Sequence, residues 1–270
     1  MNPKIIAEVG WNHMGDMDLA ANMIESAASS GADIVKFQTW FLNDLMPGPW
    51  DNDGRREIYE NAELSYDDHK FLIKKCEENN VEFLTSVFSI NGLKMIRNLN
   101  LKMIKIPSHE INNIKLIDSV NQEYEKILLS AGACTWEELN TSIKYVEKSK
   151  LVVMHCVSAY PCNPENINFQ KLNEIKSICN TVGYSGHYKG IEDAICSIVL
   201  GAKYIEKHFT IDNNLPGRDN KNAILPKDLA QLKSFRDIYS LMMINKGLDV
   251  QNVEEDIRDN YRQRWSKNDT

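Results

Sequence analysis

Short apolar runs alternate with amphipathic runs along most of the chain. The apolar runs have the length and composition of β-strands and cover residues 5–9, 33–38, 82–86, 103–106, 126–130, 151–156, 181–185 and 203–207. Between them apolar residues recur at helical spacing, as in the sets Leu19, Met23, Ile24, Ala27 and Trp136, Leu139, Ile143, Val146. Eight strand–helix units in a chain of this length predict a single-domain α/β fold, the TIM (β/α)8 barrel.

A doubly wound open sheet is the alternative fold. That fold needs a glycine-rich phosphate loop after the first strand, and the segment from Gly10 to Gly15 is a poor match. Strand-like runs recur without a change in composition, so we expect one barrel domain over residues 1–248. A charged tail, expected to form a helix or an extended arm, follows over residues 249–270. The long connection over residues 39–67 is expected to be a partly ordered lid above one end of the barrel.

The composition of the chain narrows the classes of partner that it is expected to bind. The formal charge of −7 argues against nucleic acid, which needs a basic surface. The start of the chain does not resemble a signal peptide, and no apolar run is long enough to span a membrane. The six cysteines form no C-x-x-C motif and are expected to be reduced thiols. A cytoplasmic location without membrane contact is therefore expected.

Polar and ionisable residues stand at almost every predicted strand end. Catalytic groups of such barrels sit at the carboxyl ends of the strands. Polar groups are costly to bury without partners, so a whole ring of them predicts a charged ligand. The residues at these ends and in the loops that follow are Glu8, Lys36, Gln38, Thr85, Ser86, Lys105, Ser108, Glu110, Ser130, His155, Ser158, Tyr160, Ser185, His187, Glu206, His208 and Asp219.

The residue types divide this ring into three groups. Two lysines and four hydroxyl groups suit a phosphate and a carboxylate: Lys36, Lys105, Thr85, Ser108, Ser130 and Ser185. Two histidines on neighbouring strands, His187 and His208, together with Glu8 suit Mn²⁺, Fe²⁺ or Zn²⁺. Side chains that bind hydroxyls or carry protons make the third group: Gln38, Glu110, Tyr160 and Asp219.

Structural roles remain open for several of these residues. The alternative for Lys36 and Lys105 is a structural role, in which they only pair with Glu8 or Glu206 inside the barrel. Outside the ring, His13 is expected to hydrogen-bond the backbone of its own loop, and His69 is expected to be exposed on a polar helix.

Several of these segments together resemble the sialic acid synthase family, whose members condense phosphoenolpyruvate with an N-acetylated hexose. The resemblance is carried by residues 6–16, 32–39, 105–111, 155–161, 183–187, 205–210 and 215–219, in the family's order and at matching spacings. It covers essentially the whole chain to about Pro226. As an ordered set these motifs are very specific.

The resemblance implies roles for individual residues. It implies that His187 and His208 bind a divalent metal, usually Mn²⁺, with Mg²⁺ or Co²⁺ as alternatives. It implies a phosphoenolpyruvate site made by Lys36, Thr85, Lys105, Ser108, Ser130 and Ser185. It implies a sugar site made by Gln38, Glu110, Tyr160 and Asp219. Glu8, Glu110 and Lys105 are the expected catalytic residues, and the family is expected to form homodimers.

The chain also departs from the family pattern. Gly186 stands where many members have aspartate, between the serine and the metal-binding histidine. Arg218 and Asn220 replace the proline and histidine that commonly flank the aspartate. Longer relatives continue into an antifreeze-like domain that lends an arginine to the partner's sugar site, and this chain is expected to lack it. The tail arginines Arg262 and Arg264 are one hypothetical substitute.

Three functions therefore compete. The leading hypothesis is a metal-dependent synthase that makes a sialic-acid-like nonulosonic acid and phosphate from phosphoenolpyruvate and a hexosamine-type sugar. The enzymatic alternative is a Schiff-base aldolase or lyase that uses Lys105 or Lys36 as its nucleophile. The third hypothesis is a sugar-acid-binding barrel without turnover.

Overall fold

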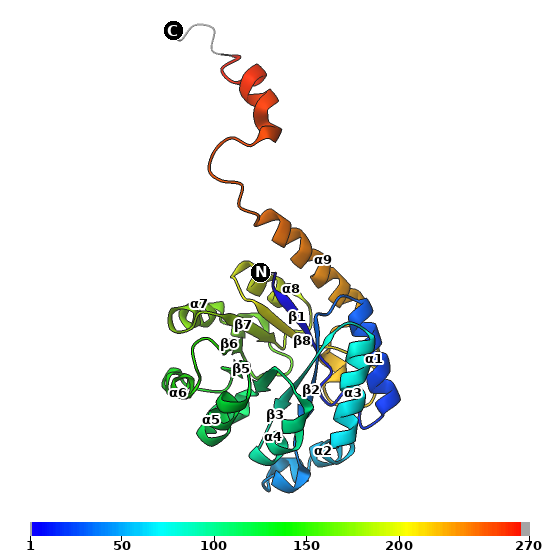
Figure 1. Ribbon diagram of the computed structural model, residues 1–270. Coiled ribbons are helices and arrows are strands. Elements are labelled where there is room, and N and C mark those ends of the chain that lie inside the picture. Colours follow the sequence, from blue (N-terminus) through cyan, green and yellow to red (C-terminus); the bar gives the residue numbers. More distant parts are fainter. Residues whose placement is uncertain (1, 266–270) are drawn as a thin grey trace.

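Eight parallel strands close into a barrel in chain order (Figure 1). The computed structural model describes residues 2–265, so Met1 and the last five residues of the predicted tail lie outside the described residues. The strands are β1 (Lys4–Glu8), β2 (Ile34–Thr39), β3 (Glu82–Val87), β4 (Met103–Ile106), β5 (Lys126–Ser130), β6 (Leu151–Cys156), β7 (Val182–Gly186) and β8 (Tyr204–His208). Each lies within one residue of its predicted range. The predicted TIM barrel is confirmed, and the open sheet is excluded because β1 pairs with β8.

Helices surround the barrel and cover the outer faces of its strands (Figure 1). Several begin at capping residues, such as Ser65, whose hydroxyl accepts from the Asp68 amide while the Asp68 carboxylate accepts from the Ser65 amide. The helices are α1 (Met17–Ser29), α2 (Arg55–Ala62), α3 (Tyr66–Glu78), α4 (Ile90–Ile96), α5 (Ile114–Glu123), α6 (Trp136–Ser142), α7 (Phe169–Ile178), α8 (Glu192–Val199) and α9 (Pro226–Met242).

The barrel interior changes from apolar to charged along its axis. An apolar layer of Ile6, Ile34, Leu84, Met103, Leu128, Val152, Met154 and Tyr204 fills its lower part. Side chains alternate between the two faces of a strand, so residues two positions further on point inward again. Those positions carry Glu8, Lys36, Ser86, Lys105, Ser130, Cys156 and Glu206. The polar layer therefore lies at the carboxyl ends of the strands.

The long connection after β2 is ordered by a cluster of aromatic rings. The Trp11 ring lies 6.3 Å from that of Trp40 and 5.2 Å from that of Tyr59, measured between centroids. The Trp40 indole also donates to the Tyr59 carbonyl over 3.2 Å. These contacts fix α2 at the carboxyl ends of the strands, as the sequence predicted for a partly ordered lid.

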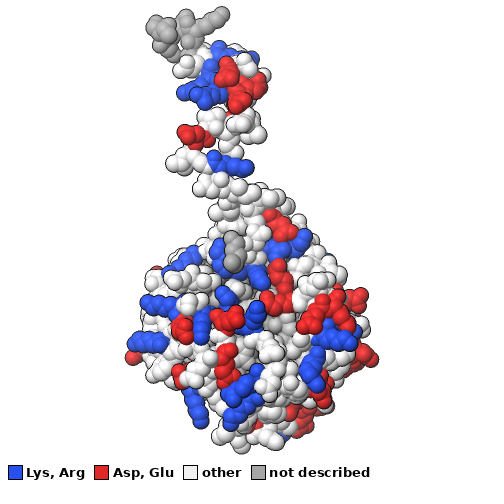
Figure 2. Space-filling view, viewed as in Figure 1, with Lys and Arg blue, Asp and Glu red and all other residues white. Residues whose placement is uncertain are grey.

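The chain leaves the barrel after α9. Figure 1 shows the segment after α9 projecting away from the helices. Residues 243–265, called the arm below, are mostly exposed and contain only short helical turns. Lysine, arginine, aspartate and glutamate side chains are interspersed over the face displayed in Figure 2. Within residues 2–265, no helix combines the length and the apolar character needed to cross a membrane.

Candidate active site

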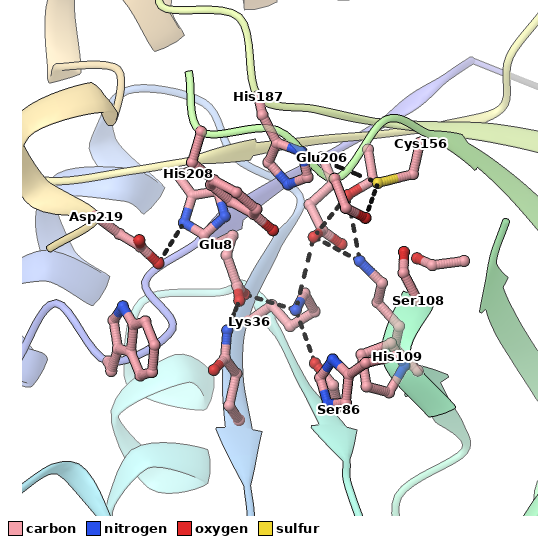
Figure 3. A pocket seen from close by; sticks show the side chains of 18 of the residues that line it. Glu8, Lys36, Ser86, Ser108, His109, Cys156, His187, Glu206, His208 and Asp219 are labelled. Carbon is pink, nitrogen blue, oxygen red and sulfur yellow. Dashed lines mark hydrogen bonds and ion pairs between the residues drawn. The ribbon is translucent and has the colours of Figure 1, made fainter. Parts of the chain in front are cut away.

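A cavity of about 340 Å³ opens at the carboxyl ends of the strands (Figure 3). Its volume is within the range typical of small-molecule sites, ~300–1,000 Å³. It brings together most of the residues that the sequence singled out: Glu8, Lys36, Gln38, Lys105, Ser108, Ser130, Ser158, Tyr160, Ser185, His187, Glu206, His208 and Asp219. The cavity is therefore the candidate active site.

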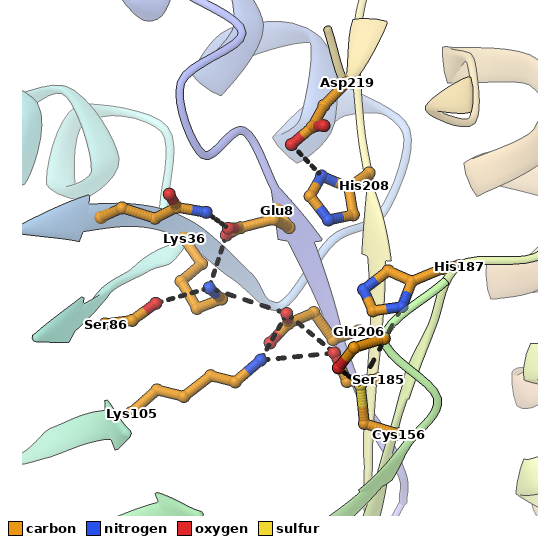
Figure 4. A network of polar contacts seen from close by, with 12 residues as sticks. Glu8, Lys36, Ser86, Lys105, Cys156, Ser185, His187, Glu206, His208 and Asp219 are labelled. Atoms are coloured by element: carbon orange, nitrogen blue, oxygen red, sulfur yellow. Dashed lines mark hydrogen bonds and ion pairs between the residues drawn. The ribbon is translucent and has the colours of Figure 1, made fainter. Parts of the chain in front are cut away.

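Four buried charges form a ring at the bottom of this cavity (Figure 4). Lys36 Nζ lies 2.7 Å from the Glu8 carboxylate and 3.6 Å from Glu206, and Lys105 Nζ lies 2.6 Å from Glu206. Lys36 also donates to Ser86 over 2.9 Å, and Ser185 donates to Glu206 over 3.1 Å. Two lysines thus face two glutamates, and the ring has no net charge when all four side chains are ionised.

Burial and the ion pairs within the ring together decide whether the pKa of each of the four side chains is raised or lowered. Burial alone raises the pKa of a carboxyl, but Lys105 and Lys36 outweigh it and hold the pKa of Glu206 at about 2. For Glu8, burial prevails over Lys36 and the pKa is raised. Burial lowers the pKa of Lys105, whereas for Lys36 the two glutamates outweigh burial and the pKa is raised.

Hydroxyl groups surround the ring and converge near Gly132. A Cβ atom at Gly132 would lie only 2.5 Å from the hydroxyls of Ser108 and Ser158, so glycine allows these side chains to approach the β5–α6 loop. Ser130 Oγ is buried and has no hydrogen-bond partner within residues 2–265. A buried hydroxyl without a partner that lines the same cavity as two ammonium groups is suited to an oxyanion ligand.

Two imidazoles lie side by side above the ring. The His187 and His208 ring centroids are 5.5 Å apart. His187 Nδ1 donates to the Val157 carbonyl over 2.7 Å, which leaves Nε2 free to accept or to bind a metal. His208 Nδ1 lies 3.5 Å from the Asp219 carboxylate. The pair can supply two nitrogen ligands to a divalent cation.

The carboxylate that was expected to complete this metal site lies elsewhere. Glu8 accepts from Gln38 over 2.6 Å and pairs with Lys36, so it belongs to the charged ring. In the part of the chain that the structure describes, no three His, Cys, Asp or Glu side chains are close enough to hold a metal together. A metal at the two imidazoles would take its other ligands from water or substrate, as open catalytic sites do.

The space beside Gly186 is occupied by a carboxylate from α8. A Cβ atom at Gly186 would lie 2.2 Å from Asp193 Oδ2. Asp193 pairs with Lys207 Nζ over 2.8 Å and accepts from the Tyr184 hydroxyl over 3.0 Å. Lys207 is the β8 partner of Gly186, so this buried contact joins the strand ends that carry the two imidazoles. Gly186 thus leaves room for Asp193 from the neighbouring helix.

Thr85 was expected to help bind phosphoenolpyruvate, but it does not line the cavity. On β3, Leu84 belongs to the barrel interior, so Thr85 points outward and Ser86 points into the cavity. Thr85 lies 2.8 Å from Thr39 Oγ1, which donates to His69 Nε2 over 2.7 Å. His69 is fully buried against β2 and β3, so its expected exposure is also wrong.

Glu110 lies beside the cavity but does not line it. Its carboxylate accepts from the Asn113 amide over 2.7 Å, and burial raises its pKa. The neighbouring His109 lines the cavity instead. The expected backbone contact of His13 is confirmed, because the Gly15 amide donates to His13 Nδ1 over 3.1 Å.

Sequence reasoning did not assign several residues of the cavity wall, among them four that come from α2 and from the loops after β1 and β8. These four are Trp11, Arg55, Tyr59 and Arg218. Only the aromatic character of the lid hinted at Tyr59, and Arg218 stood out only as a departure next to Asp219. Their positions depend on how the lid and the loop after β8 fold over the barrel, which strand periodicity does not determine.

Comparisons with known proteins agree with this geometry. A family model described as "NeuB family" matches residues 23–246, well over half of the chain. An N,N'-diacetyllegionaminic acid synthase from Campylobacter jejuni is 33% identical over 84% of this chain and 73% of its own length. The human N-acetylneuraminate-9-phosphate synthase is 29% identical over 90% of this chain and 70% of its own length.

A solved structure is similar over almost the whole chain. It is an N-acetylneuraminic acid (sialic acid) synthetase from Leptospira borgpetersenii in complex with citrate. The TM-score is 0.87 at 29% sequence identity, and the match covers 99% of this chain and 94% of that one.

Proposed function

The chain belongs to the NeuB family and is an enzyme of the N-acetylneuraminate synthase type, and we propose that it condenses phosphoenolpyruvate with the aldehyde of an N-acetylated or modified hexose. The products are a sialic-acid-like nonulosonic acid and phosphate. One observation carries the proposal: two buried lysines and two adjacent imidazoles open onto the same cavity. The named relatives are synthases of this class.

The reaction forms one carbon–carbon bond and exchanges the carbon–oxygen bond to phosphate for one to water. The methylene carbon of phosphoenolpyruvate attacks the aldehyde carbon of the open-chain sugar, and the aldehyde oxygen gains a proton. Water adds to the resulting cationic carbon and loses one proton, and the tetrahedral carbon then loses inorganic phosphate with its bridging oxygen. The remaining hydroxyl loses its proton to become the keto group, and the phosphate takes up a proton. Proton transfer at both oxygens needs polar groups beside the reacting carbons.

Phosphoenolpyruvate is proposed to bind at the charged ring. Lys36 and Lys105 would exchange part of their contact with Glu8 and Glu206 for the phosphate and carboxylate of the substrate. Ser108, Ser130 and Ser185 would donate to the same oxyanions, and Ser86 takes the place proposed for Thr85. These groups sit on rigid strand ends, so they stabilise the charge of the leaving phosphate without reorganising.

The sugar is proposed to lie between the ring and the lid. Gln38, Tyr160 and Asp219 line this part of the cavity and suit hydroxyl groups. Glu8 lies between Lys36 and Gln38 and is our candidate for proton transfer to the sugar. Glu110 would need to turn away from Asn113 to take part.

A divalent metal, most suitably Mn²⁺, is proposed to bind His187 and His208. The free Nε2 of His187 supports this assignment. A bound metal supplies Lewis-acid polarisation of the aldehyde oxygen. The imidazoles would hold it beside the sugar end of the cavity, and Asp219 would orient His208 through Nδ1.

We also propose an oligomeric state and a location for the enzyme. A homodimer is proposed because large apolar side chains on the end of α9 and on the arm are exposed. A cytoplasmic enzyme that binds neither nucleic acid nor membrane is proposed, supported by six free cysteines and a formal charge of −7.

The test is product formation with a panel of N-acetylhexosamines and their derivatives, phosphoenolpyruvate and Mn²⁺. We expect phosphate release that depends on one of the sugars and a product whose mass equals sugar plus pyruvate. Lys105→Met should abolish turnover, and Lys102→Met, at an exposed lysine just before β4, should not. Phosphoenolpyruvate binding without phosphate release for every sugar would favour a binding barrel.

Chelation separates the synthase from a Schiff-base enzyme. The synthase should lose activity in EDTA and recover it with Mn²⁺. Borohydride should trap no adduct on Lys36 or Lys105. A trapped adduct together with activity that survives EDTA would sink the synthase proposal.

A further inference from the structure

A buried ammonium group connects the two short segments that carry the imidazoles. Lys207 directly precedes His208 in the chain, and its Nζ atom donates to the Tyr188 carbonyl over 2.6 Å. Tyr188 directly follows His187, and the two imidazoles lie next to each other in Figure 4. One side chain therefore reaches from the residue before one imidazole to the residue after the other.

A carboxylate from α8 holds this ammonium group in place. Both oxygens of Asp193 accept from Lys207 Nζ, over 3.0 and 2.8 Å. With the Tyr188 carbonyl these contacts match the three N–H donors of an ammonium group. The Tyr184 hydroxyl donates to the same carboxylate over 3.0 Å. The Lys207 and Asp193 side chains are 2% and 0% exposed, so the pair is fixed inside the protein.

This ion pair lies where the register between β7 and β8 ends. The last paired residues are Gly186 and Lys207, one position before His187 and His208. A second cavity of about 10 Å³ is lined by Gly186, Lys207 and both imidazoles. This is room for about one water molecule, so side chains do not fill the space beside the rings. The separation of the imidazoles therefore depends on how the strand ends are held.

The partners of the rings themselves act on one imidazole each. His187 Nδ1 donates to the Val157 carbonyl, and His208 Nδ1 faces the Asp219 carboxylate. These contacts orient each ring about its own side chain. The contacts of Lys207 differ, because they act on the backbone next to both rings.

Fold stability does not explain why a charged pair stands at this place. Burial of two charges is costly, and uncharged residues of similar volume are often equally stable. Metal-binding imidazoles depend on the groups that hold them, and loss of such a group weakens metal binding ~10- to 100-fold. A buried pair that holds both strand ends is therefore suited to a metal site.

We infer that Asp193 and Lys207 are positioning residues that set the separation of the two imidazoles and thereby the affinity of the site for a divalent metal. The inference rests on the proposed function, which places the metal at His187 and His208. Gly186 is part of the arrangement, because a Cβ atom there would lie 2.2 Å from Asp193 Oδ2.

The experiment measures metal binding instead of turnover. Free Mn²⁺ gives an electron paramagnetic resonance signal that is lost on binding, so a titration gives the Kd. The variant that combines Asp193→Asn with Lys207→Met removes both charges and keeps an acceptor for the Tyr184 hydroxyl. We expect its melting temperature to stay close to the parent value and its Kd for Mn²⁺ to rise ~10- to 100-fold.

Two further measurements test the geometry directly. The visible absorption of bound Co²⁺ depends on the arrangement of its ligands, so the spectrum of the double variant should differ from that of the parent protein. Gly186→Ala places a methyl group against Asp193 and keeps both charges. This variant should also raise the Kd for Mn²⁺.

The matched control is a second double variant at the opposite end of the barrel. Asp33→Asn with Arg236→Met removes the ion pair between α9 and the residue before β2. The Arg236 side chain is 9% exposed, so this pair is also largely buried. Its removal should leave the Kd for Mn²⁺ unchanged, because the pair lies at the amino ends of the strands.

The outcomes separate the inference from the function on which it rests. A Kd within about twofold of the parent value in the folded Asp193→Asn and Lys207→Met variant would overturn the inference and leave the synthase intact. Equal weakening by the control would also overturn it, since general destabilisation would then explain the loss. If the double variant does not fold, an unchanged Kd in Gly186→Ala overturns the inference. A parent protein that binds no Mn²⁺ would overturn the proposed metal dependence and the inference with it.

Discussion

At the scale of single residues, Gly186 leaves room for a buried ion pair that joins two strand ends. Asp193 reaches from α8 into the place where a side chain at position 186 would lie. Its partner Lys207 is only 2% exposed, and Lys207 also donates to the Tyr188 carbonyl over 2.6 Å. The buried pair therefore ties the ends of β7 and β8 together. Motif spacing alone cannot reveal this contact, because Gly186 and Asp193 lie on different elements.

Asp193→Asn should destabilise the fold. The change leaves the Lys207 ammonium buried without its counter-charge, which costs about 3–5 kcal/mol in free energy of unfolding. Urea denaturation measures this loss. Lys233→Ala is the control, since its pair with Asp237 is exposed and should cost less than about 1 kcal/mol. Equal effects of the two variants would contradict a structural role for the buried pair.

His13 should make the fold sensitive to acid. Burial lowers its pKa from 6.5 to about 4, a difference of about 3 kcal/mol. Because the folded-state value is the lower one, this contribution is fully present above pH 6.5 and is lost as the pH falls towards 4. His13→Gln keeps an acceptor for the Gly15 amide and removes the titration. Urea denaturation at about pH 7 and about pH 4.5 should show a smaller acid loss in the variant. If His13→Gln lost as much stability in acid as the parent protein, other titrating groups would be responsible for the loss.

At the scale of elements, strand positions followed from the sequence but strand faces did not. Strands of a parallel barrel are buried on both sides, so apolar residues occupy both faces and the alternating signal is weak. On β3, Phe83 packs outside the barrel and Leu84 inside. Either face was therefore compatible with the sequence, and the choice between Thr85 and Ser86 needed the neighbouring strands.

The lid should depend on Trp40. Its ring lies 5.6 Å from that of Tyr59 and 5.5 Å from that of Phe88, both of which line the cavity. Trp40→Ala should cost about 3–5 kcal/mol and loosen α2. We expect faster proteolysis within residues 42–62 and a higher KM for the sugar at similar kcat. Trp136→Ala, a partly exposed tryptophan on α6, is the control. Proteolysis at the parental rate would mean that other contacts hold the lid.

At the scale of the whole molecule, the barrel and the inner half of its site were predictable because both follow from periodicity and from motifs at strand ends. The outer part of the cavity was not, because Arg55 on α2 and Arg218 after β8 reach it only when the connections that carry them fold over the barrel. The charged ring lies on strand ends, with His187 directly after β7 and His208 at the end of β8. The outer wall of the cavity comes instead from α2 and from the loop after β8.

The end of α9 and the arm expose several large apolar side chains, which bear on how the chain assembles. Leu241, Met242, Met243 and Leu248 are each more than 60% exposed, and Val253 and Trp265 follow along the arm with exposures of 87% and 88%. Monomeric proteins rarely leave so many large apolar side chains uncovered in one stretch. A second copy that packs against the end of α9 and the arm would cover them and give the proposed homodimer.

Leu241→Glu with Leu248→Glu should therefore weaken the dimer by ~100-fold or more, because each change places a charge on an apolar contact. Sedimentation velocity over a range of protein concentrations measures the dissociation constant. Trp136→Glu is the matched control, since Trp136 is 40% exposed on α6, which Figure 1 shows on the side of the barrel away from α9 and the arm. The barrel should keep its melting temperature in all variants, because these side chains lie outside its core. A parent protein that sediments as a monomer at every concentration would contradict the dimer and leave the arm's apolar surface to a different partner.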